Sequence, residues 1–280
     1  MTKNRIDYPA GALSAYDSGG HSWMFEYPRL DMAVYDRYEE AIDTWEIGEV
    51  DLAEQALRDL IADYPEFIDV YHHLAMLLEA SGREEEAFQM WQQVVQMGLE
   101  CVGEGFEPGR DRLEWGYLDN RPFLRAYHGL GLAYLERGDR QKAFEIFRNI
   151  LAMNPNDNQG IRGILADMAL DLGKPEEVLA LCDRYPNDAM EQLVYGRPLA
   201  LLMLGREQEA KAALQEAVDL FPLIGEELIK ETHEVPAGWS PEYVTMGGED
   251  QAYDYWMEQG AHWVSTPGAL ELVRECLGKK

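Results

Sequence analysis

The chain has 280 residues, 46% of them apolar, and its 52 acidic and 24 basic side chains give a net charge of −28. That apolar fraction is typical of a folded protein with a sizeable core and excludes wholesale disorder. The acidic excess disfavours binding to nucleic acids and to anionic membranes, because both depend on Lys and Arg. A basic partner fits this charge, and so does adaptation of the protein to a salt-rich cytoplasm.

Residues 1–30 carry scattered Pro and Gly together with several aromatic side chains. Such a composition predicts an irregular N-terminal arm rather than a regular element. We expect this arm to pack on the rest of the chain through Trp23, Phe25 and Tyr27.

Five glycines then follow apolar helical stretches and precede charged ones: Gly48, Gly82, Gly138, Gly173 and Gly205. Successive members are 34, 56, 35 and 32 residues apart, and the interval of 56 equals one 34-residue unit plus an insertion of 22. Five residues after each glycine stands a small or β-branched residue. A fixed period of about 34 residues indicates a repeated helix–turn–helix unit.

The third unit, AYHGLGLAYLERGDRQKAFEIFRNILAMNPND, resembles the tetratricopeptide repeat, and the resemblance covers about residues 33–222. It predicts a first helix, helix A, with Gly131 at a close crossing and Tyr134 beside it. Ala143 and Phe147 belong to the second helix, helix B, and Pro155 ends the unit. The fifth unit departs from the family by placing Pro198 inside its helix A, which predicts a kink there or a late helix start.

The predicted fold is therefore all-α: a right-handed solenoid of about five such repeats over residues 31–222. Residues 99–120 form an inserted loop that is expected to be functional or mobile, and Asp119 or Asn120 is positioned to cap the following helix. Residues 223–280 are predicted to form a tail and a helical cap. Its last helix is expected to start at Thr266-Pro267 and to end at Gly278.

The resemblance also implies that the helix A side chains line a concave groove that binds peptides. Carried over position by position, these side chains form a predominantly aromatic and apolar set: Tyr35, Tyr38, Trp45, His72, Met76, Arg125, His128, Leu132 and Tyr195. Aromatic, Met and Arg side chains are typical of binding hot spots. The Lys and Asn that a chaperone-tail clamp requires are replaced in the first repeat by Tyr38 and Ile42, so that subclass is disfavoured.

No catalytic, cofactor or metal residues are predicted. The sequence contains no phosphate-binding loop, no GxSxG and no HExxH. His72 and His73 are adjacent and would point about 100° apart on a helix, which does not suit one metal ion. Three isolated cysteines and the lack of an apolar leader or of a 20-residue apolar run indicate a cytoplasmic protein with neither disulfides nor a membrane segment.

The leading hypothesis is an adaptor that binds a protein or peptide, without enzymatic activity, in an oligomeric state that the sequence leaves open. A structural or self-assembling scaffold, whose groove is filled by its own termini or by a second copy, is the first alternative. A ligand-binding protein or enzyme that uses Tyr38, His72, Arg125 and His128 is the second alternative.

Overall fold

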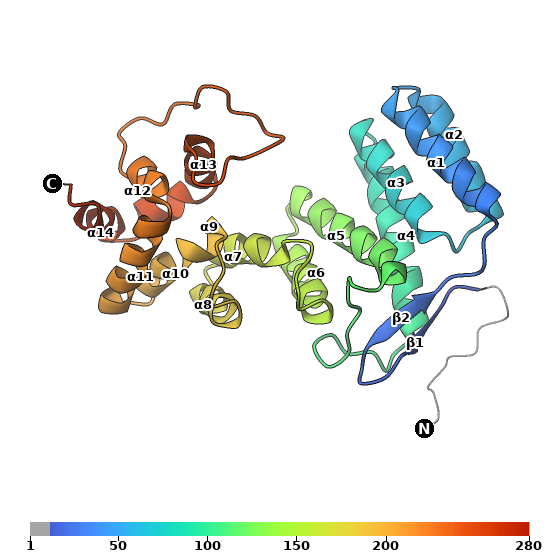
Figure 1. Cartoon of the computed structure of the whole chain (residues 1–280), viewed down its shortest axis with the longest axis horizontal. Helices are drawn as coiled ribbons and strands as arrows, with labels where there is room; N and C mark the ends of the chain where they lie inside the picture. The colour runs from blue at the N-terminus through green and yellow to red at the C-terminus, as the bar shows by residue number, and fades with distance from the viewer. Residues whose placement is uncertain (1–11, 280) are drawn as a thin grey trace. The chain divides into compact units, whose positions relative to one another are not determined.

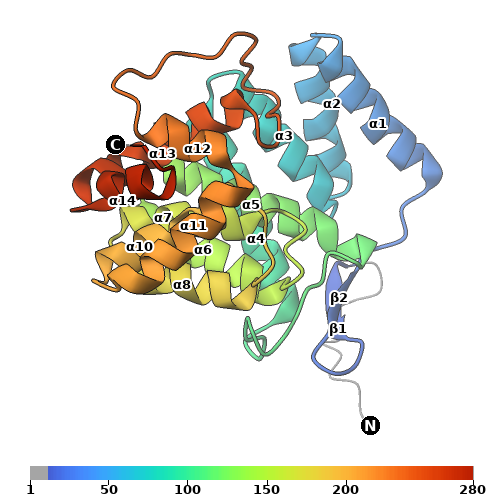
Figure 2. The ribbon, with the colours of Figure 1, turned by 60° about the vertical axis from the view of Figure 1, so that its left-hand side comes forward.

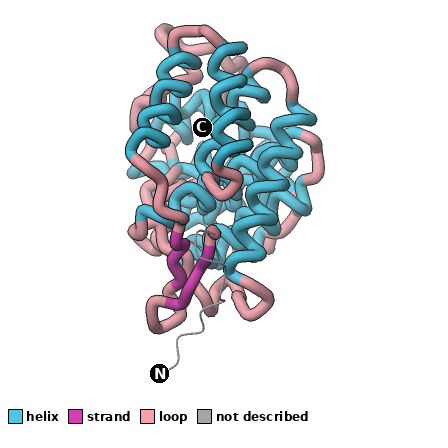
Figure 3. The backbone as a smooth tube through the Cα atoms, turned by 90° about the vertical axis from the view of Figure 1, so that its right-hand side faces the viewer, coloured by secondary structure: helices cyan, strands magenta, loops and turns pink. Residues whose placement is uncertain are grey.

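The computed structural model describes residues 12–279, which form two compact units (Figure 1). Unit 1 ends at Gln159 and unit 2 begins at Gly160. In the described residues, α-helices dominate and the named strands form a single two-stranded hairpin (Figure 3). The predicted all-α class is confirmed. The sequence-based division into arm, array and tail did not include the boundary at residue 159, which falls inside the array.

Unit 1 is built from pairs of consecutive helices that pack on one another. The pairs are α1 (Met32–Glu46) with α2 (Val50–Asp63), α3 (Ile68–Ala80) with α4 (Glu84–Val102), and α5 (Arg121–Glu136) with α6 (Arg140–Met153). Each pair buries the apolar side chains that recur at helical spacing, such as Leu57, Leu74 and Phe147, all of which are fully buried.

The glycine period of the sequence corresponds to the turn inside each helix pair. All five glycines have a left-handed backbone, with φ between 64° and 89°. The residue after each one donates its N–H to a carbonyl five residues earlier, as Arg83 does to Leu78 at 2.8 Å. This hydrogen bond closes the Schellman turn that ends a helix, and a left-handed residue favours glycine. The predicted repeats are therefore confirmed at the level of their turns.

Close helix crossing, which the third repeat predicted at Gly131, is also present. A Cβ placed on Gly131 would lie 2.8 Å from the ring of Phe147 and 3.2 Å from Ile146. Any larger side chain would therefore push helix α6 away from α5.

Unit 2 continues with α7 (Ile161–Asp171), α8 (Pro175–Arg184), α9 (Glu191–Val194), α10 (Gly196–Met203) and α11 (Glu207–Leu220). The predicted interruption near Pro198 is confirmed, because the helix of the fifth repeat breaks at Tyr195 into α9 and α10. Proline has no N–H to continue the ladder, so the preceding turn is free to change direction.

The tail forms α12 (Pro222–Leu228), a loop, α13 (Glu249–Ser265) and α14 (Ala269–Cys276), which Figure 2 shows beside the end of the repeats of unit 2. Trp263 and Ala252 of α13 are buried. The predicted start of α14 at Thr266-Pro267 was wrong. Thr266 instead ends α13, its hydroxyl donates to the His262 carbonyl, and the left-handed Gly268 precedes α14. Gly278, with φ of 65°, follows that helix as expected.

The prediction of an irregular arm was wrong for residues 14–26. Strands β1 (Ser14–Asp17) and β2 (Trp23–Glu26) pair antiparallel, with Ser14 opposite Glu26. The expected packing through aromatic side chains is confirmed for Trp23 and Phe25: both are buried, and the ring of Phe25 lies 5.2 Å from that of Phe123. Residues 1–11 lie outside the described part of the chain.

The insertion is an ordered connection between the hairpin and the helices. After α4 ends at Val102, the chain forms a loop and then the short 3-10 helix η1 (Leu118–Asn120). Asn120 does not cap α5 with its side chain, contrary to the expectation for Asp119 or Asn120. Its Oδ1 accepts from the Phe25 N–H at 3.0 Å, and its Nδ2 donates to the carbonyls of Trp23 and Glu114.

We expect Gly131→Val to destabilise the protein by about 1–3 kcal/mol, because the added atoms overlap the Phe147 ring. Denaturant unfolding of the full chain measures the change. Gly116→Ala, at a position with open space around it, is the matched control and should change stability by less than about 0.5 kcal/mol. Equal stabilities of the two variants would contradict the close crossing.

We expect Asn120→Ala to cost roughly 2–4 kcal/mol, since it leaves the buried Phe25 N–H and two carbonyls without their partner. Asn158→Ala, at an exposed turn position of the same unit, is the control. Amide hydrogen exchange of Phe25 should accelerate in the first variant and stay unchanged in the second. Unchanged exchange in both would show that Asn120 does not hold the hairpin.

Candidate functional site

Helices α1, α3 and α5 are the first helices of the three hairpins of unit 1, and we call the side on which their predicted groove residues lie the inner face. It contains eight of the nine predicted groove residues: Tyr35, Tyr38, Trp45, His72, Met76, Arg125, His128 and Leu132. Helices α3 and α5 pack directly on one another, and α1 packs on α3. The repeat geometry thus brings residues that are up to about a hundred positions apart in sequence to one surface.

The ring of Tyr38 connects α1 to α3. Its hydroxyl lies 2.8 Å from Nδ1 of His73, and that nitrogen lies 2.9 Å from the Asp69 carbonyl oxygen. The ring also packs on Phe67, with 5.1 Å between centroids. Burial, followed by the negative charge of Asp69, raises the pKa of Tyr38. Tyr38 is therefore a neutral hydrogen-bonding group at physiological pH.

His72 lies at the centre of the inner face and is held by Trp91, whose Nε1 donates to His72 Nδ1 at 3.3 Å. Burial lowers the pKa of His72 to about 3, and positive charge on His73, Arg125 and His128 lowers it further in the same direction. The imidazole is therefore neutral at pH 7. Such a weak base is poorly suited to general acid–base catalysis, which works best with a pKa near the working pH.

Arg125 and His128 provide the polar groups of α5. Arg125 Nη2 donates to Asp69 Oδ1 at 2.6 Å, which joins α5 to α3. The Arg125 Nε and the His128 Nε2 are buried and have no hydrogen-bond partner among the described residues. Gln159 donates to the Leu124 carbonyl and approaches His128 Nδ1 at 3.5 Å. Burial lowers the pKa of His128, so this imidazole also favours its neutral form.

Three apolar side chains of the inner face extend into solvent. Tyr35, Met76 and Leu132 are 38–39% exposed, whereas Trp45, on the last turn of α1, is half-buried. They stand on the hydrogen-bonded layer formed by Tyr38, His72 and Arg125 and their partners. The surface therefore combines exposed apolar anchors with a fixed polar base.

The ninth predicted residue, Tyr195, does not belong to this surface. It lies in unit 2 between α9 and α10, its side chain is fully buried, and its hydroxyl donates to the Phe221 carbonyl at 2.7 Å. The break in the fifth repeat turns this position into the core, so Tyr195 is a packing residue.

Sequence reasoning missed Asp69 and His73, which hold Arg125 and Tyr38 in place. Their spacing to the predicted residues carried a weak signal: Asp69 and His73 are one helical turn apart on α3, so both can reach toward the same neighbouring helices. Which neighbour each one meets depends on how the hairpins stack.

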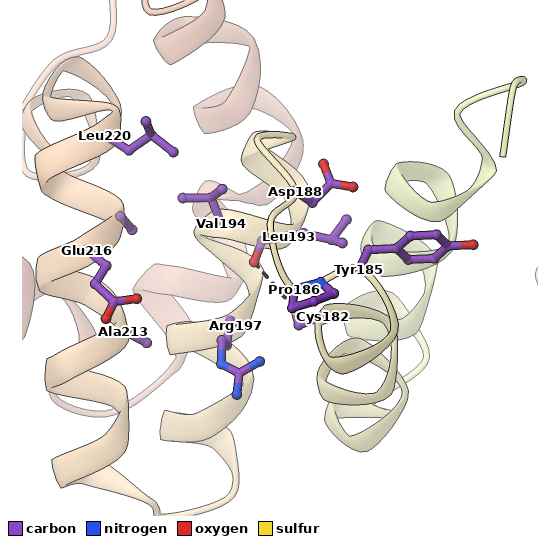
Figure 4. Close-up of a pocket in the computed structure, with 11 residues that line it drawn as sticks. Cys182, Tyr185, Pro186, Asp188, Leu193, Val194, Arg197, Ala213, Glu216 and Leu220 are labelled. Atoms are coloured by element: carbon purple, nitrogen blue, oxygen red, sulfur yellow. Dashed lines mark hydrogen bonds between the residues drawn. The ribbon is translucent and has the colours of Figure 1, made fainter. Parts of the chain in front are cut away.

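Cavities are present in both units. In unit 2, a cavity of about 160 Å³ lies among α8, α9, α10 and α11, with Cys182, Asp188 and Arg197 in its wall (Figure 4). Burial raises the pKa of Cys182 to about 11, so its sulfur remains a thiol and is not poised for nucleophilic attack. In unit 1, a cavity of about 500 Å³ lies beside the insertion, between Phe106 and Tyr127.

Residues 12–279 contain neither a metal-binding cluster nor a helix able to span a membrane. No group of three or more His, Cys, Asp or Glu side chains is arranged to hold a metal ion. None of the helices there combines the length and hydrophobicity that crossing a lipid bilayer requires.

Repeated helix hairpins with a glycine turn define the class of this protein: it is a tetratricopeptide-like helical-repeat protein. A tetratricopeptide repeat protein from Parabacteroides merdae superimposes with a TM-score of 0.51 at 15% identity, over 89% of this chain and 98% of that one. The MamA protein superimposes with a TM-score of 0.49 at 15% identity, over 74% of this chain and 100% of that one. The first of these likenesses supports the fold.

A family model described as transcriptional repressor TCF25 matches residues 24–245. The chain belongs to this family. The match spans both units, from strand β2 of the arm to the loop before α13. No curated protein matches the chain.

We expect the free energy of unfolding to fall as the pH drops from 6.5 toward 3 through the titration of His72. The unfolded imidazole binds a proton near pH 6.5, whereas the folded one does so only near pH 3, so protons favour unfolding in that window. Between pH 6.5 and 5 the loss should be about 2 kcal/mol. Denaturant titrations of the wild type and His72→Gln measure it, and the variant should lose less. An identical pH dependence in the two proteins would contradict the neutral, buried state of His72.

Proposed function

We propose that this protein is a non-enzymatic adaptor whose inner face in unit 1 binds a segment of another protein. The observation that carries the proposal is the row of exposed apolar side chains, Tyr35, Met76 and Leu132, on a polar layer that is already hydrogen-bonded. Exposed anchors on a preorganised base lose little side-chain entropy on binding, which favours affinity.

Acidic side chains beside these anchors favour a segment with basic residues. Glu79 follows Met76 by three positions on α3, and Glu136 follows Leu132 by four on α5. Burial raises the pKa of Glu79, and the nearby Glu136 and Glu84 raise it further, so these carboxylates repel one another. A Lys or Arg on the partner would relieve that repulsion. The net charge of −28 supports the same partner and disfavours direct contact with nucleic acid.

The family description extends the proposal to the biological setting. A transcriptional repressor that carries such an acidic surface would act through other proteins rather than through the DNA backbone. We therefore propose that the partner belongs to the transcription machinery and that the chain acts where transcription takes place. The competing location is the cytoplasm, which the sequence analysis predicted.

The alternative of a groove filled by the chain's own arm receives limited support within unit 1. The hairpin packs on α4 and on η1, and Cys101 of α4 approaches the Leu13 carbonyl at 3.6 Å. Tyr27, just after β2, is buried close enough to Asp69 and Arg125 for their charges to act on its pKa. The arm thus borders the inner face at the Asp69–Arg125 pair and leaves Tyr35, Met76 and Leu132 exposed.

Site-specific photo-crosslinking in the native host tests the binding surface. A benzoylphenylalanine placed at Tyr35, Met76 or Leu132 should crosslink a discrete protein, because each side chain faces the proposed segment. The matched control is Leu52, a 64% exposed apolar residue on the helix B side of the first hairpin. Equal crosslinking at Leu52, or no crosslink from any of the three positions, would refute the proposed face.

With the crosslinked partner in hand, Leu132→Asp should weaken its binding about tenfold or more, as truncation of an interface anchor does. Leu52→Asp should leave the affinity unchanged. The identity of the partner then tests the proposed role in transcription. A partner without such a role would refute that part of the proposal and leave the binding surface standing.

A further inference from the structure

Three helices of unit 2 each contribute a side-chain oxygen that is buried without a partner. These oxygens are Oδ1 of Asp167 on α7, Oε1 of Gln192 on α9 and Oε1 of Gln259 on α13. None has a hydrogen-bond partner among the described residues. Gln259 is only 2% exposed, so its amide oxygen is far from bulk water. Buried polar atoms in folded proteins are nearly always hydrogen-bonded, and a group of orphaned acceptors therefore calls for an explanation.

Helix α7, which carries Asp167, packs against α9. Gly163 lies one helical turn before Asp167 on α7, and a Cβ placed on Gly163 would lie 3.5 Å from the Gln192 Oε1. The small residue thus makes room for the Gln192 amide on the face of α7 that also carries Asp167, one turn further on. Helices α7 and α9 are packed against one another along this line.

The same face of α7 meets α13. His262 Nε2 lies 2.9 Å from Asp171 Oδ1, one turn after Asp167. Nearer the start of α13, Tyr255 lies close enough to Asp167 for the charge of Asp167 to raise the pKa of Tyr255. Because Gln259 lies between Tyr255 and His262 on one face of α13, its side chain is level with Asp167. The three oxygens therefore belong to α7 and to the two helices that pack on it, α9 and α13, and we call them the acceptor cluster.

The side chains around the acceptor cluster carry negative charge. Burial raises the pKa of Asp167 to about 8, and the charges of Glu258, Glu191 and Asp171 raise it in the same direction. Asp167 is therefore mostly protonated at pH 7 when no cation is bound, and an ammonium group would bind as that proton leaves. Glu191 already accepts from the Gln251 amide at 2.8 Å. The exposed Glu258 marks where solvent reaches the cluster.

We propose that the acceptor cluster binds the primary ammonium group of a lysine side chain presented by a partner protein. An ammonium group carries three N–H donors and one positive charge, which match three acceptors around one carboxylate. It would enter past Glu258, and rotation of the terminal torsions of the glutamines would aim their oxygens at it. Calcium and magnesium sites generally draw on more oxygen ligands than this cluster offers.

A partner is the favoured source of the lysine because the chain itself is strongly acidic and poor in lysine, with 7 Lys against 52 Asp and Glu. In unit 2, Lys211, Lys230 and Lys279 are paired with Glu275, Glu227 and Glu226. The site consists only of unit 2 residues, so it holds or fails independently of the inner face of unit 1.

The test is a titration of the full chain, followed by NMR at the side-chain amides of Gln192 and Gln259. The first probe is n-butylammonium chloride, and tetramethylammonium chloride at equal concentration is its control because it has the charge without N–H donors. We expect saturable shifts at both amides with butylammonium and none with tetramethylammonium. Equal responses to the two cations would refute a hydrogen-bonded ammonium site. An absence of response to both would show that water satisfies these oxygens, which also overturns the proposal.

Two variants assign the site. Asp167→Asn should weaken butylammonium binding about tenfold or more, because a charged hydrogen bond becomes a neutral one. It should still fold, since the carboxyl group that it replaces makes no hydrogen bond through Oδ1. Glu176→Gln, which removes an exposed charge from α8 of the same unit, should bind as the wild type does. Wild-type binding by Asp167→Asn would overturn the proposal, as would a stronger saturable response to magnesium chloride.

A third probe distinguishes a lysine in a protein from a free amine. Acetyl-Gly-Lys-Gly-amide should shift the same amides at lower concentration than butylammonium, and the peptide with acetylated lysine should not shift them. Binding of butylammonium without binding of the lysine peptide would overturn the assignment to a protein partner. A preference for methylguanidinium over butylammonium would assign the site to arginine and overturn the lysine assignment.

Discussion

A left-handed glycine at the turn of every helix pair is the constraint on which the rest of this structure depends. It lets helix A end within one residue and turn back, so that helix B packs along its full length. Where the two helices cross most closely, a second small residue such as Gly131 removes the side chain that would keep them apart. Because the same geometry recurs in successive hairpins, the helix A side chains fall on one surface, and distant residues such as Tyr38 and Arg125 become neighbours of the same α3 side chains.

Both units contain buried polar atoms without partners among the described residues, and the two proposed sites differ in the kind of atom that is left unpaired. At the base of the inner face in unit 1, Tyr38 contacts His73, Trp91 donates to His72, and Arg125 binds Asp69. These contacts fix the side chains beneath the exposed apolar anchors, and burial keeps the imidazoles of His72 and His128 neutral. The nitrogens Arg125 Nε and His128 Nε2 have no partner among the described residues. In unit 2, acceptor oxygens from three helices remain without partners in an acidic setting. A paired layer serves as a rigid platform, whereas an unpaired set of acceptors is suited to receive a donor from outside.

The arm and the insertion show how segments outside the repeats become part of the fold. One buried amide, Asn120, connects the β2 strand, the loop of the insertion and the start of α5 through three hydrogen bonds. Asp111 of the insertion, itself buried, accepts from His21 in the hairpin turn. The family match begins inside this hairpin, at residue 24, so it includes most of β2 and leaves β1 outside.

The sequence by itself determined the helices, their pairing and the turns between them, because those depend on local chemistry: glycines at a 34-residue period, apolar residues at helical spacing and Pro198 at the break in the fifth repeat. It also predicted eight residues for the inner face, since repeat position fixes which side of a helix a residue occupies. Only the tertiary structure decided which partners these residues meet. His73, Asp69 and Asn120 act through contacts with residues 35 to 97 positions away, and such contacts leave no local pattern. The same reason explains misjudged positions such as Tyr195 and the unforeseen β-hairpin: burial and strand pairing depend on what packs against a segment, which its own residues do not specify.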